Sequence, residues 1–400
     1  MHSSFESKLN QSIVHDIYSN CLTSGFKLIR GRFTELCEME DMDPTEEYVF
    51  QKRGLKSKNR SLLAAMTNKQ SHEDGTLSDE EITWLTRRAK DGFGIVTTAA
   101  SHVSELGKGW IGEMGVWSDN HIEGLTKLST SLKQYGSLNL VQIFHGGMKA
   151  PFEINNVIPV CPSKMMIEAT GKLLARSLEN EEIYQLIEDF SDAAKRCEDA
   201  GFDGVEIHGA HSYLISQFLG LKTNRRKDEF GGSLENRFRF LKEIILSIRK
   251  KTSEDFLVAE RISPKISSIG INIEDSIEVT KMLCEMDIDM FHLSCWDAFE
   301  ELEGGQNLTN LFRPYVPENI AYTSTGAIWS TADAKWLMEQ GADFVGVARV
   351  AIAHPNWAQG LSDTNYEPKR PPFTKDELLT ADLSPVFVDY MCNWKGFVVK

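Results

Sequence analysis

Short apolar segments alternate with longer amphipathic ones along this chain from about residue 61 onward. Each short segment has six to eight residues and is rich in β-branched or small apolar side chains. Segments of this length and composition are typical of buried strands and are too short for ordinary helices. We predict strands at 61–66, 94–101, 138–145, 204–209, 256–263, 290–295, 320–326 and 344–349.

The longer segments place apolar residues at steps of three and four positions, which is typical of helices with one buried face. We predict helices at 78–91, 180–200, 235–251, 274–286 and 331–339. Ser78 is followed three residues later by Glu81, a capping-box pattern at a helix start. Gly341 stands just after the last of these helices, as a C′ glycine does.

Eight strands with a helix in most gaps predict an α/β fold of the (β/α)8 TIM-barrel type. An open doubly wound sheet usually has fewer strands, and no G-x-G-x-x-G follows the first strand. We expect a single barrel domain over residues 46–365. Residues 1–45 form an N-terminal extension that we expect to be poorly ordered or packed locally, and residues 366–400 form a C-terminal extension that we expect to pack on the barrel.

Composition narrows the class of protein. The chain is 41% hydrophobic and 25% charged, as in globular proteins, and its net charge of −15 argues against a broad nucleic-acid-binding face. It has no apolar run of the ~20 residues that cross a membrane. Its seven cysteines include no C-x-x-C pair, so we expect no metal site and a reducing, cytoplasmic location, with only a weak similarity to an organellar transit segment in the first 45 residues.

Polar residues gather where the predicted strands end, which is where a TIM barrel builds its active site. The ends carry Thr67, Gln142, His145, His208, His211, Tyr213, Arg261, Gly326–Ala327 and Ala348–Arg349. Each residue alone is more often structural than functional. Together, at several different strand ends, they form a set that is much more specific than any member.

This set matches what a flavin mononucleotide needs. The Gln142 amide can pair with the donors and acceptors of the pyrimidine edge, and a hydroxyl such as that of Thr67 can favour reduction. Arg261 can stabilise the edge that becomes anionic on reduction. Backbone N–H groups after the last two strands, with Arg349, can hold the phosphate. Structural histidines or a metal remain alternatives for His208 and His211, although a third ligand at metal-binding spacing is not evident.

The run EIHGAHSYLISQFLGLKTNRRKDEFGGSLENRFRF, within 205–240, resembles the signature of the Old Yellow Enzyme family of NAD(P)H:flavin oxidoreductases. Shorter motifs of that family occur on both sides of this run, in the same order along the chain as in the family. The resemblance covers about 46–365. The shorter motifs are KNR at 58–60, AAMT at 64–67, VQIFHGG at 141–147, RIS at 261–263 and GVAR at 346–349.

The resemblance implies a TIM barrel with non-covalent FMN, reduced by NADPH or NADH, that passes hydride to electron-poor alkenes such as enones. It implies that His208 and His211 bind the substrate carbonyl oxygen and that Tyr213 protonates the α-carbon. The implied cofactor-binding residues are Ala65, Met66, Thr67, Ala99, Gln142, Arg261, Gly326, Ala327, Ala348 and Arg349.

Some positions depart from the family pattern. Ala65 stands where proline is usual, Ala348 where glycine is usual, and Lys69 where some members carry a substrate-facing tyrosine. These changes affect the expected substrate range more than flavin binding. Two alternatives remain: a dienoyl-CoA-reductase-like flavoenzyme, disfavoured by the length and the scattered cysteines, and a catalytically idle flavin-binding barrel that serves as an interaction module. The physiological substrate, the preferred nicotinamide and the oligomeric state are not fixed by the sequence.

Overall fold

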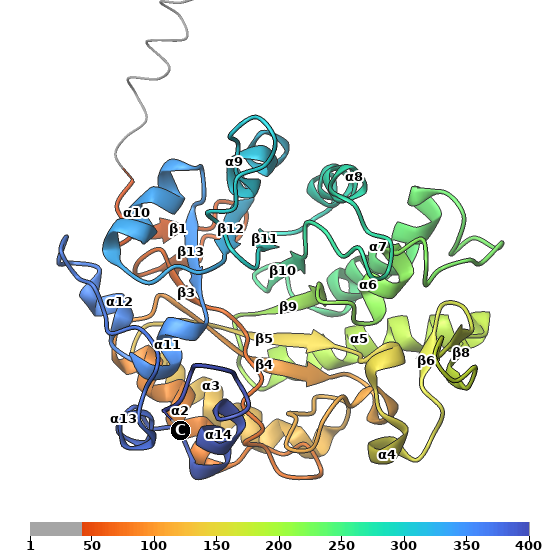
Figure 1. Cartoon of the computed structure of the whole chain (residues 1–400), viewed down its shortest axis with the longest axis horizontal. Coiled ribbons are helices and arrows are strands. Elements are labelled where there is room, and N and C mark those ends of the chain that lie inside the picture. The colour runs from red at the N-terminus through yellow and green to blue at the C-terminus, as the bar shows by residue number, and fades with distance from the viewer. Residues whose placement is uncertain (1–41, 400) are drawn as a thin grey trace, which may run out of the picture. The chain divides into compact units, whose positions relative to one another are not determined.

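Eight parallel strands close into a barrel in the computed structural model, which describes residues 42–399 (Figure 1). Neighbouring strands follow in chain order around the barrel, and the last pairs with the first through Val345 and Ser61. The strands are β3 (Ser61–Leu63), β4 (Ile95–His102), β5 (Leu138–Phe144), β9 (Gly204–Gly209), β10 (Leu257–Ile262), β11 (Met290–Ser294), β12 (Ala321–Thr325) and β13 (Phe344–Val347). The predicted fold class and all eight predicted strands are confirmed, most of them one to three residues shorter than predicted.

The predicted helices are present as α2 (Asp79–Lys90), α5 (Asn180–Asp199), α7 (Leu234–Lys251), α8 (Ile273–Cys284) and α10 (Thr331–Glu339). A further helix, α3 (Ile122–Lys133), fills the gap between β4 and β5. The capping box at α2 is only half formed. Ser78 accepts from the Glu81 N–H, but the Glu81 carboxylate turns inward and accepts from Asn68 and Ser71.

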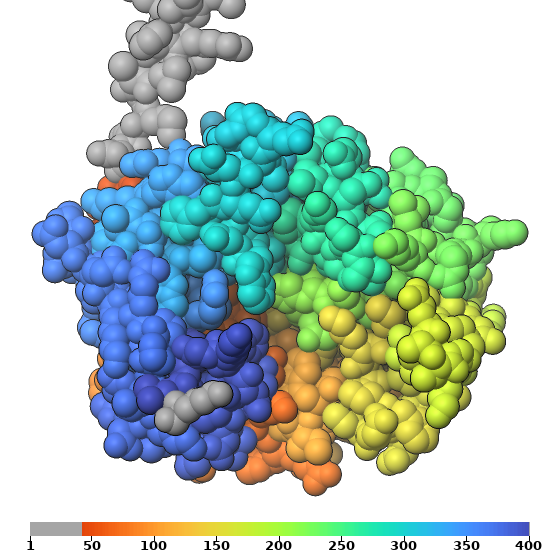
Figure 2. Space-filling model, viewed as in Figure 1, coloured from red at the N-terminus to blue at the C-terminus, as the bar shows by residue number. Residues whose placement is uncertain are grey.

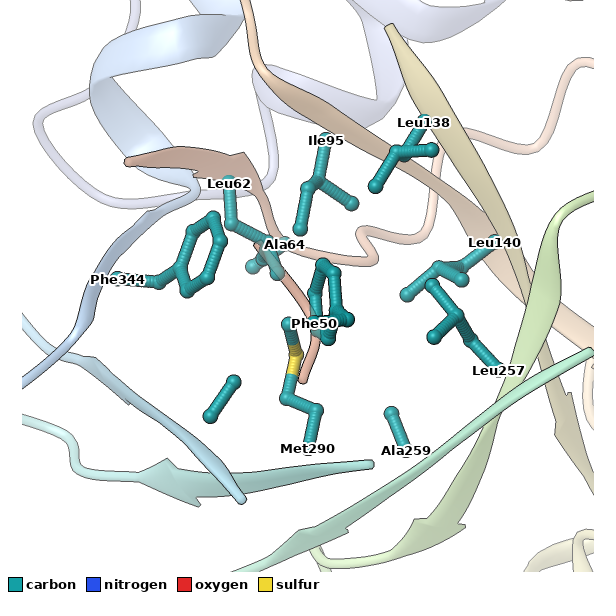
Figure 3. Packing of buried hydrophobic residues seen from close by; sticks show 11 residues of the cluster. Phe50, Leu62, Ala64, Ile95, Leu138, Leu140, Leu257, Ala259, Met290 and Phe344 are labelled. Carbon is teal, nitrogen blue, oxygen red and sulfur yellow. The ribbon is translucent and has the colours of Figure 1, made fainter. Parts of the chain in front are cut away.

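The amino ends of the strands are closed by a hairpin of β1 (Tyr48–Val49) and β2 (Lys56–Ser57). Phe50, in the connection, lies at the centre of a cluster that takes residues from the surrounding strands, such as Leu62, Leu140 and Met290 (Figure 3). Its ring stacks on Phe344 with centroids 5.8 Å apart. This plug fills one end of the barrel, so a ligand site is left for the carboxyl ends.

Several short elements extend the loops at those carboxyl ends. After β5 come α4 (Phe152–Asn155) and a small sheet of β6 (Val160–Cys161), β7 (Met165–Met166) and β8 (Leu173–Ser177). Later loops carry α6 (Leu214–Leu219), α9 (Leu308–Phe312), α11 (Arg349–Ala353) and α12 (Trp357–Gly360). Three-residue 3-10 turns lie at Glu105–Gly107, Asp119–His121, Gly147–Lys149 and Arg313–Tyr315.

The C-terminal extension packs on the barrel through α13 (Lys375–Thr380) and α14 (Pro385–Met391), as expected. Phe387 is fully buried against Trp84 of α2, with ring centroids 5.4 Å apart. Within residues 42–399 no helix combines the length and the apolar character that spanning a membrane requires. The predicted N-terminal extension and its transit-like character lie almost wholly outside the described residues.

Candidate active site

A cavity of about 270 Å³ lies at the carboxyl ends of the strands. Figure 2 shows a hollow in this face beside the dark blue C-terminal residues. Nine of the residues singled out in the sequence line the cavity: Ala65, Met66, Thr67, His211, Arg261, Gly326, Ala327, Ala348 and Arg349. The other five are not part of its lining: Ala99, Gln142, His208 and Tyr213, whose contacts are described below, and His145, a buried residue whose Nδ1 accepts the Gly147 N–H at 3.0 Å.

Arg261 lies at the end of β10 with its guanidinium almost fully buried. One terminal nitrogen donates to Ser294 Oγ at 3.0 Å and the other to the Ala65 carbonyl at 3.4 Å. Its Nε has no hydrogen-bond partner within residues 42–399, so a donor is left for a ligand. A buried cation with a free N–H suits the edge of a flavin that becomes anionic on reduction.

Ser294, at the end of β11, links Arg261 to His211. Because a guanidinium only donates, Ser294 Oγ accepts from Arg261, and its single hydrogen can go to His211 Nε2, 2.9 Å away. His211 then carries its proton on Nδ1 and can donate from there. Burial and the nearby Arg261 cation hold the pKa of His211 well below its usual value, so the ring is neutral.

His208 ends β9 and is 3% exposed. Its Nδ1 accepts the Ala210 N–H at 3.3 Å, so the proton of the neutral ring lies on Nε2. Burial, followed by His211 and Arg261, lowers the pKa of His208 well below its usual range. The two imidazole rings are perpendicular with centroids 5.0 Å apart, and in these tautomers each ring has one N–H that can be donated to a ligand.

The turn after β9 is strained. His211 and Ser212 have φ values of 59° and 65°, in the left-handed region that costs a non-glycine residue roughly 1 kcal/mol. The turn is held by the His211 N–H donating to Ser263 Oγ at 3.2 Å. Strain of this kind is common where a backbone must present a side chain to a ligand.

Tyr213 follows that turn and lies beside His208, with ring centroids 5.0 Å apart. Phe144, at the end of β5, meets Tyr213 edge to face at 4.9 Å, and Trp110 stacks on Phe144 at 5.5 Å. Burial, and then the nearby Glu113, raises the pKa of Tyr213 above its usual value. The phenol therefore keeps its proton at neutral pH and can serve as an acid.

Gln142 is held from behind by a chain of fully buried polar residues. Its Nε2 donates to Glu206 Oε1 at 2.6 Å, Glu206 Oε2 accepts from His292 Nδ1 at 2.6 Å, and His292 Nε2 lies 2.5 Å from Thr325 Oγ1. Although burial opposes ionisation, His292 and the other donors lower the pKa of Glu206. A carboxylate accepts only, so it fixes which end of the Gln142 amide faces it.

Ala99 sits at an irregularity where the register of β4 against β5 shifts between Thr97 and Ala100. Its carbonyl accepts from the hydroxyls of Thr98 and Ser101 at 2.8 and 2.9 Å. Both lone pairs of that carbonyl are occupied, which leaves only the N–H of Ala99 for a cofactor.

The far end of the cavity suits a phosphate. Gly326 and Gly346 leave no room for a side chain, because an added Cβ would lie 2.8 Å from the Ala298 backbone and 2.1 Å from Thr325 Oγ1. Arg349 begins α11 and holds its guanidinium over the exposed ring of Trp296, 5.6 Å from the centroid.

The other end of α11 is anchored by fully buried Arg88 of α2. Its guanidinium donates to the carbonyls of Ala351 and Ile352 at 2.8 to 3.2 Å. These bonds satisfy carbonyls at the end of α11 that have no partner within the helix. The helix that carries Arg349 is therefore fixed to the barrel wall.

Sequence reasoning missed Ser294, Glu206 and His292, which are buried polar residues inside apolar strands. The signal was available, because a polar side chain within such a strand is costly unless it is paired. It also missed Tyr390, Met391, Trp394 and Phe397, which line the cavity from the C-terminal segment. Within residues 42–399 no cluster of three or more His, Cys, Asp or Glu could hold a metal ion.

Comparison with known proteins decides the family. The model of the NADH:flavin oxidoreductase / NADH oxidase family matches residues 52–367. The chain belongs to this family. The Old Yellow Enzyme resemblance is confirmed, and the protein is an FMN-dependent NAD(P)H oxidoreductase.

Two relatives and one solved structure illustrate the match. The chain is 35% identical to the probable NADH-dependent flavin oxidoreductase YqiG of Bacillus subtilis, over 78% of this chain and 86% of that protein. It is also 35% identical to an NADPH dehydrogenase of Bacillus pumilus, over 76% and 90% of the two chains. The old yellow enzyme homologue of Zymomonas mobilis superposes with a TM-score of 0.74 at 25% identity, over 87% of this chain and 99% of that one.

Proposed function

We propose that this oxidoreductase reduces the C=C bond of electron-poor alkenes, such as α,β-unsaturated carbonyl compounds. The observation that carries the proposal is the arrangement of His208, His211 and Tyr213. Two neutral imidazoles, each with one free N–H, lie together, and a protonated phenol lies 5.0 Å from one of them between ring centroids.

Each residue has a role in this reaction. Bound FMN supplies the hydride for the β-carbon of the alkene. His208 Nε2 and His211 Nδ1 donate hydrogen bonds to the carbonyl oxygen and stabilise the negative charge that develops there. Tyr213 gives its proton to the α-carbon. Phe144 and Trp110 form an apolar wall beside Tyr213 that limits access of water.

The cofactor roles follow the same geometry. We assign Thr67, Gln142 and Arg261, with the neighbouring Ala65–Met66 and the N–H of Ala99, to the isoalloxazine. Gly326–Ala327 and Ala348–Arg349 are assigned to the phosphate, where close backbone approach and a guanidinium are available.

The test is an anaerobic visible-spectrum titration of the purified holoprotein with NADPH and then NADH, followed by a cyclic enone. We expect the nicotinamide to bleach the flavin absorbance and the enone to restore it with formation of the saturated ketone. A flavin that is bleached but not restored by the enone would contradict the alkene-reductase assignment, because oxidation by the substrate is half of the reaction.

A further inference from the structure

The C-terminal segment contributes side chains to the site. Residues after 367 lie beyond the family match, yet α14 brings Tyr390 into the cavity wall. The helix is held in place by the buried Phe387, and the backbone N–H of Ser384 donates to the Gln70 side chain at 3.2 Å. Tyr390 is thus a fixed part of the cavity and comes from an element that the family comparison does not assign.

A lysine lies against Tyr390. Lys69 Nζ is 5.0 Å from the centroid of the Tyr390 ring, and Lys69 follows the cavity-lining Thr67 by two residues. The backbone of Lys69 has φ 59°, and an added Cβ on Gly112 would fall 2.3 Å from its carbonyl oxygen. This strained residue places its side chain against Tyr390, which lines the cavity, and such strain is common at ligand sites.

A second lysine lies against the catalytic phenol. Lys149 Nζ is 5.1 Å from the centroid of the Tyr213 ring and donates to the His211 carbonyl at 2.7 Å. Burial lowers the pKa of Lys149, although the side chain as a whole is exposed. Each lysine thus lies against a residue of the cavity wall, Lys149 against His211 and Lys69 against Tyr390.

Neither ammonium is neutralised by the protein. Among the described residues, no carboxylate lies within 4.0 Å of Lys69 or Lys149, whereas many other lysines are paired, such as Lys127 with Asp79 at 2.6 Å. The chain as a whole carries a net charge of −15. Two unpaired cations beside the catalytic residues of an acidic protein leave a local positive potential that attracts an anion.

We propose that Lys69, Lys149 and Tyr390 form a subsite for an anionic substituent on the alkene substrate, a carboxylate in the simplest case. Two ammonium groups and a phenolic O–H supply charge-assisted hydrogen bonds of the kind that bind carboxylates. The subsite rests on the proposed function, because it orients an alkene whose carbonyl is bound by His208 and His211. The phosphates of NADH or NADPH are the other source of an anion near the flavin, and the experiment separates the two.

The experiment measures binding of matched phenols to the oxidised holoenzyme by visible absorbance. Phenols stand in for the substrate carbonyl at the two histidines. Hydroxybenzoate and hydroxybenzamide have almost the same shape and differ by one negative charge, and both the meta and para isomers are used. We expect the wild type to bind the benzoate of at least one isomer about ten-fold more tightly than its amide, which corresponds to about 1.4 kcal/mol.

Five variants and one control locate the effect. Lys69→Met and Lys149→Met should each remove most of the preference for benzoate, taken as the ratio of the two affinities in the same variant so that a change common to both phenols cancels. Tyr390→Phe should reduce this ratio less. Lys69→Arg and Lys149→Arg keep the charge and should retain the preference. Lys172→Met, on an exposed lysine of the small β6–β8 sheet region, is the control and should change neither affinity.

The outcomes are distinguishable. Equal affinity for benzoate and benzamide in the wild type, or an unchanged preference in both methionine variants, overturns the subsite. Failure of every phenol to bind overturns the proposed function and the subsite with it. If the methionine variants instead weaken reduction of the flavin by NADH and NADPH and leave the benzoate preference intact, the anion is the dinucleotide phosphate, and the assignment to the substrate is wrong.

Discussion

The carboxylate of Glu206 lies 2.6 Å from Nδ1 of His292, and both side chains are completely buried beneath the cavity. The other carboxylate oxygen accepts from Gln142, the residue assigned to the flavin pyrimidine. The buried Glu206–His292 pair and the residue that we assign to the cofactor are therefore one hydrogen-bonded unit. A change at Glu206 should therefore alter FMN binding and the flavin midpoint potential, although Glu206 does not line the cavity.

Glu206→Gln tests this unit. The variant removes a negative charge close to the flavin site. Its new amide N–H would also face one of the two donors that Glu206 now accepts from, Gln142 Nε2 or His292 Nδ1. We expect weaker FMN binding and a midpoint potential that is higher by on the order of tens of millivolts, because a nearby anion disfavours reduction. The measurements are FMN fluorescence titration of the apoprotein and a dye-equilibrated reduction. Exposed Glu168→Gln is the matched control, and an unchanged potential would show that the pair is only structural.

Ser294→Ala should disturb His211 more than the flavin. The hydroxyl accepts from Arg261 and lies 2.9 Å from His211 Nε2, to which it can donate its hydrogen. Its loss should weaken binding of a neutral phenol roughly ten-fold, in line with a hydrogen bond worth about 1–1.5 kcal/mol. Absorbance titration measures the affinity, and Ser294→Thr, which keeps a hydroxyl, should restore most of it. Wild-type affinity in the alanine variant would show that Ser294 does not orient His211 for binding.

Tyr213→Phe should separate the two half-reactions. Flavin reduction by NAD(P)H needs no proton from this phenol and should keep its rate. Oxidation by an enone should slow by roughly 10²–10⁴-fold, the usual contribution of a general acid. Stopped-flow absorbance resolves both steps. Tyr184→Phe, on an exposed tyrosine of α5, is the control, and equal enone rates in the two variants would exclude Tyr213 as the acid.

The enone half-reaction should be nearly independent of pH between 7 and 9. The pKa of Tyr213 is raised above its usual 10, so the phenol stays protonated throughout this range. The pKa values of His208 and His211 are lowered well below 6.5, so both rings stay neutral. Single-turnover rates of pre-reduced enzyme measure this. A rate that falls steadily as pH rises would mean that the proton donor titrates within the range.

Phe50→Ala should destabilise the fold without touching the site. Phe50 is 2% exposed and fills the amino end of the barrel, so its removal leaves a cavity and should cost about 3–5 kcal/mol in the free energy of unfolding. Urea unfolding of the holoprotein measures the loss. Phe152→Ala, at a side chain that is 52% exposed, is the control and should cost far less.

The strands were predictable because short apolar, β-branched runs bounded by polar turns are typical of buried strands. Gly204–Gly209 was predicted to the residue, whereas β3 ends at Leu63 because the chain then turns to line the cavity. Residues at or shortly beyond the strand ends, such as Arg261 and Thr67, were found for the same reason. The buried side chains that hold the site residues in place were not predicted. Ser294 contacts Arg261, and His292 reaches Gln142 only through Glu206, so each acts across different strands.

Tyr390 could not have been found from its surroundings in the sequence. It reaches the site only because α14 folds back on the barrel, more than 300 residues after Thr67. No local pattern records such a contact. The same holds for Lys149, whose position over Tyr213 depends on how two successive barrel loops are arranged.

The pairing of β13 with β3 has a consequence for how the protein is made. Thr67 and Arg349 border the same cavity, yet their strands meet only when the segment around residue 344 reaches the one around residue 61. Contacts of such long sequence separation form late and slowly. A growing or half-folded barrel therefore lacks the residues that we assign to one end of FMN or those that we assign to the other, and we expect FMN to bind only once the ring is complete.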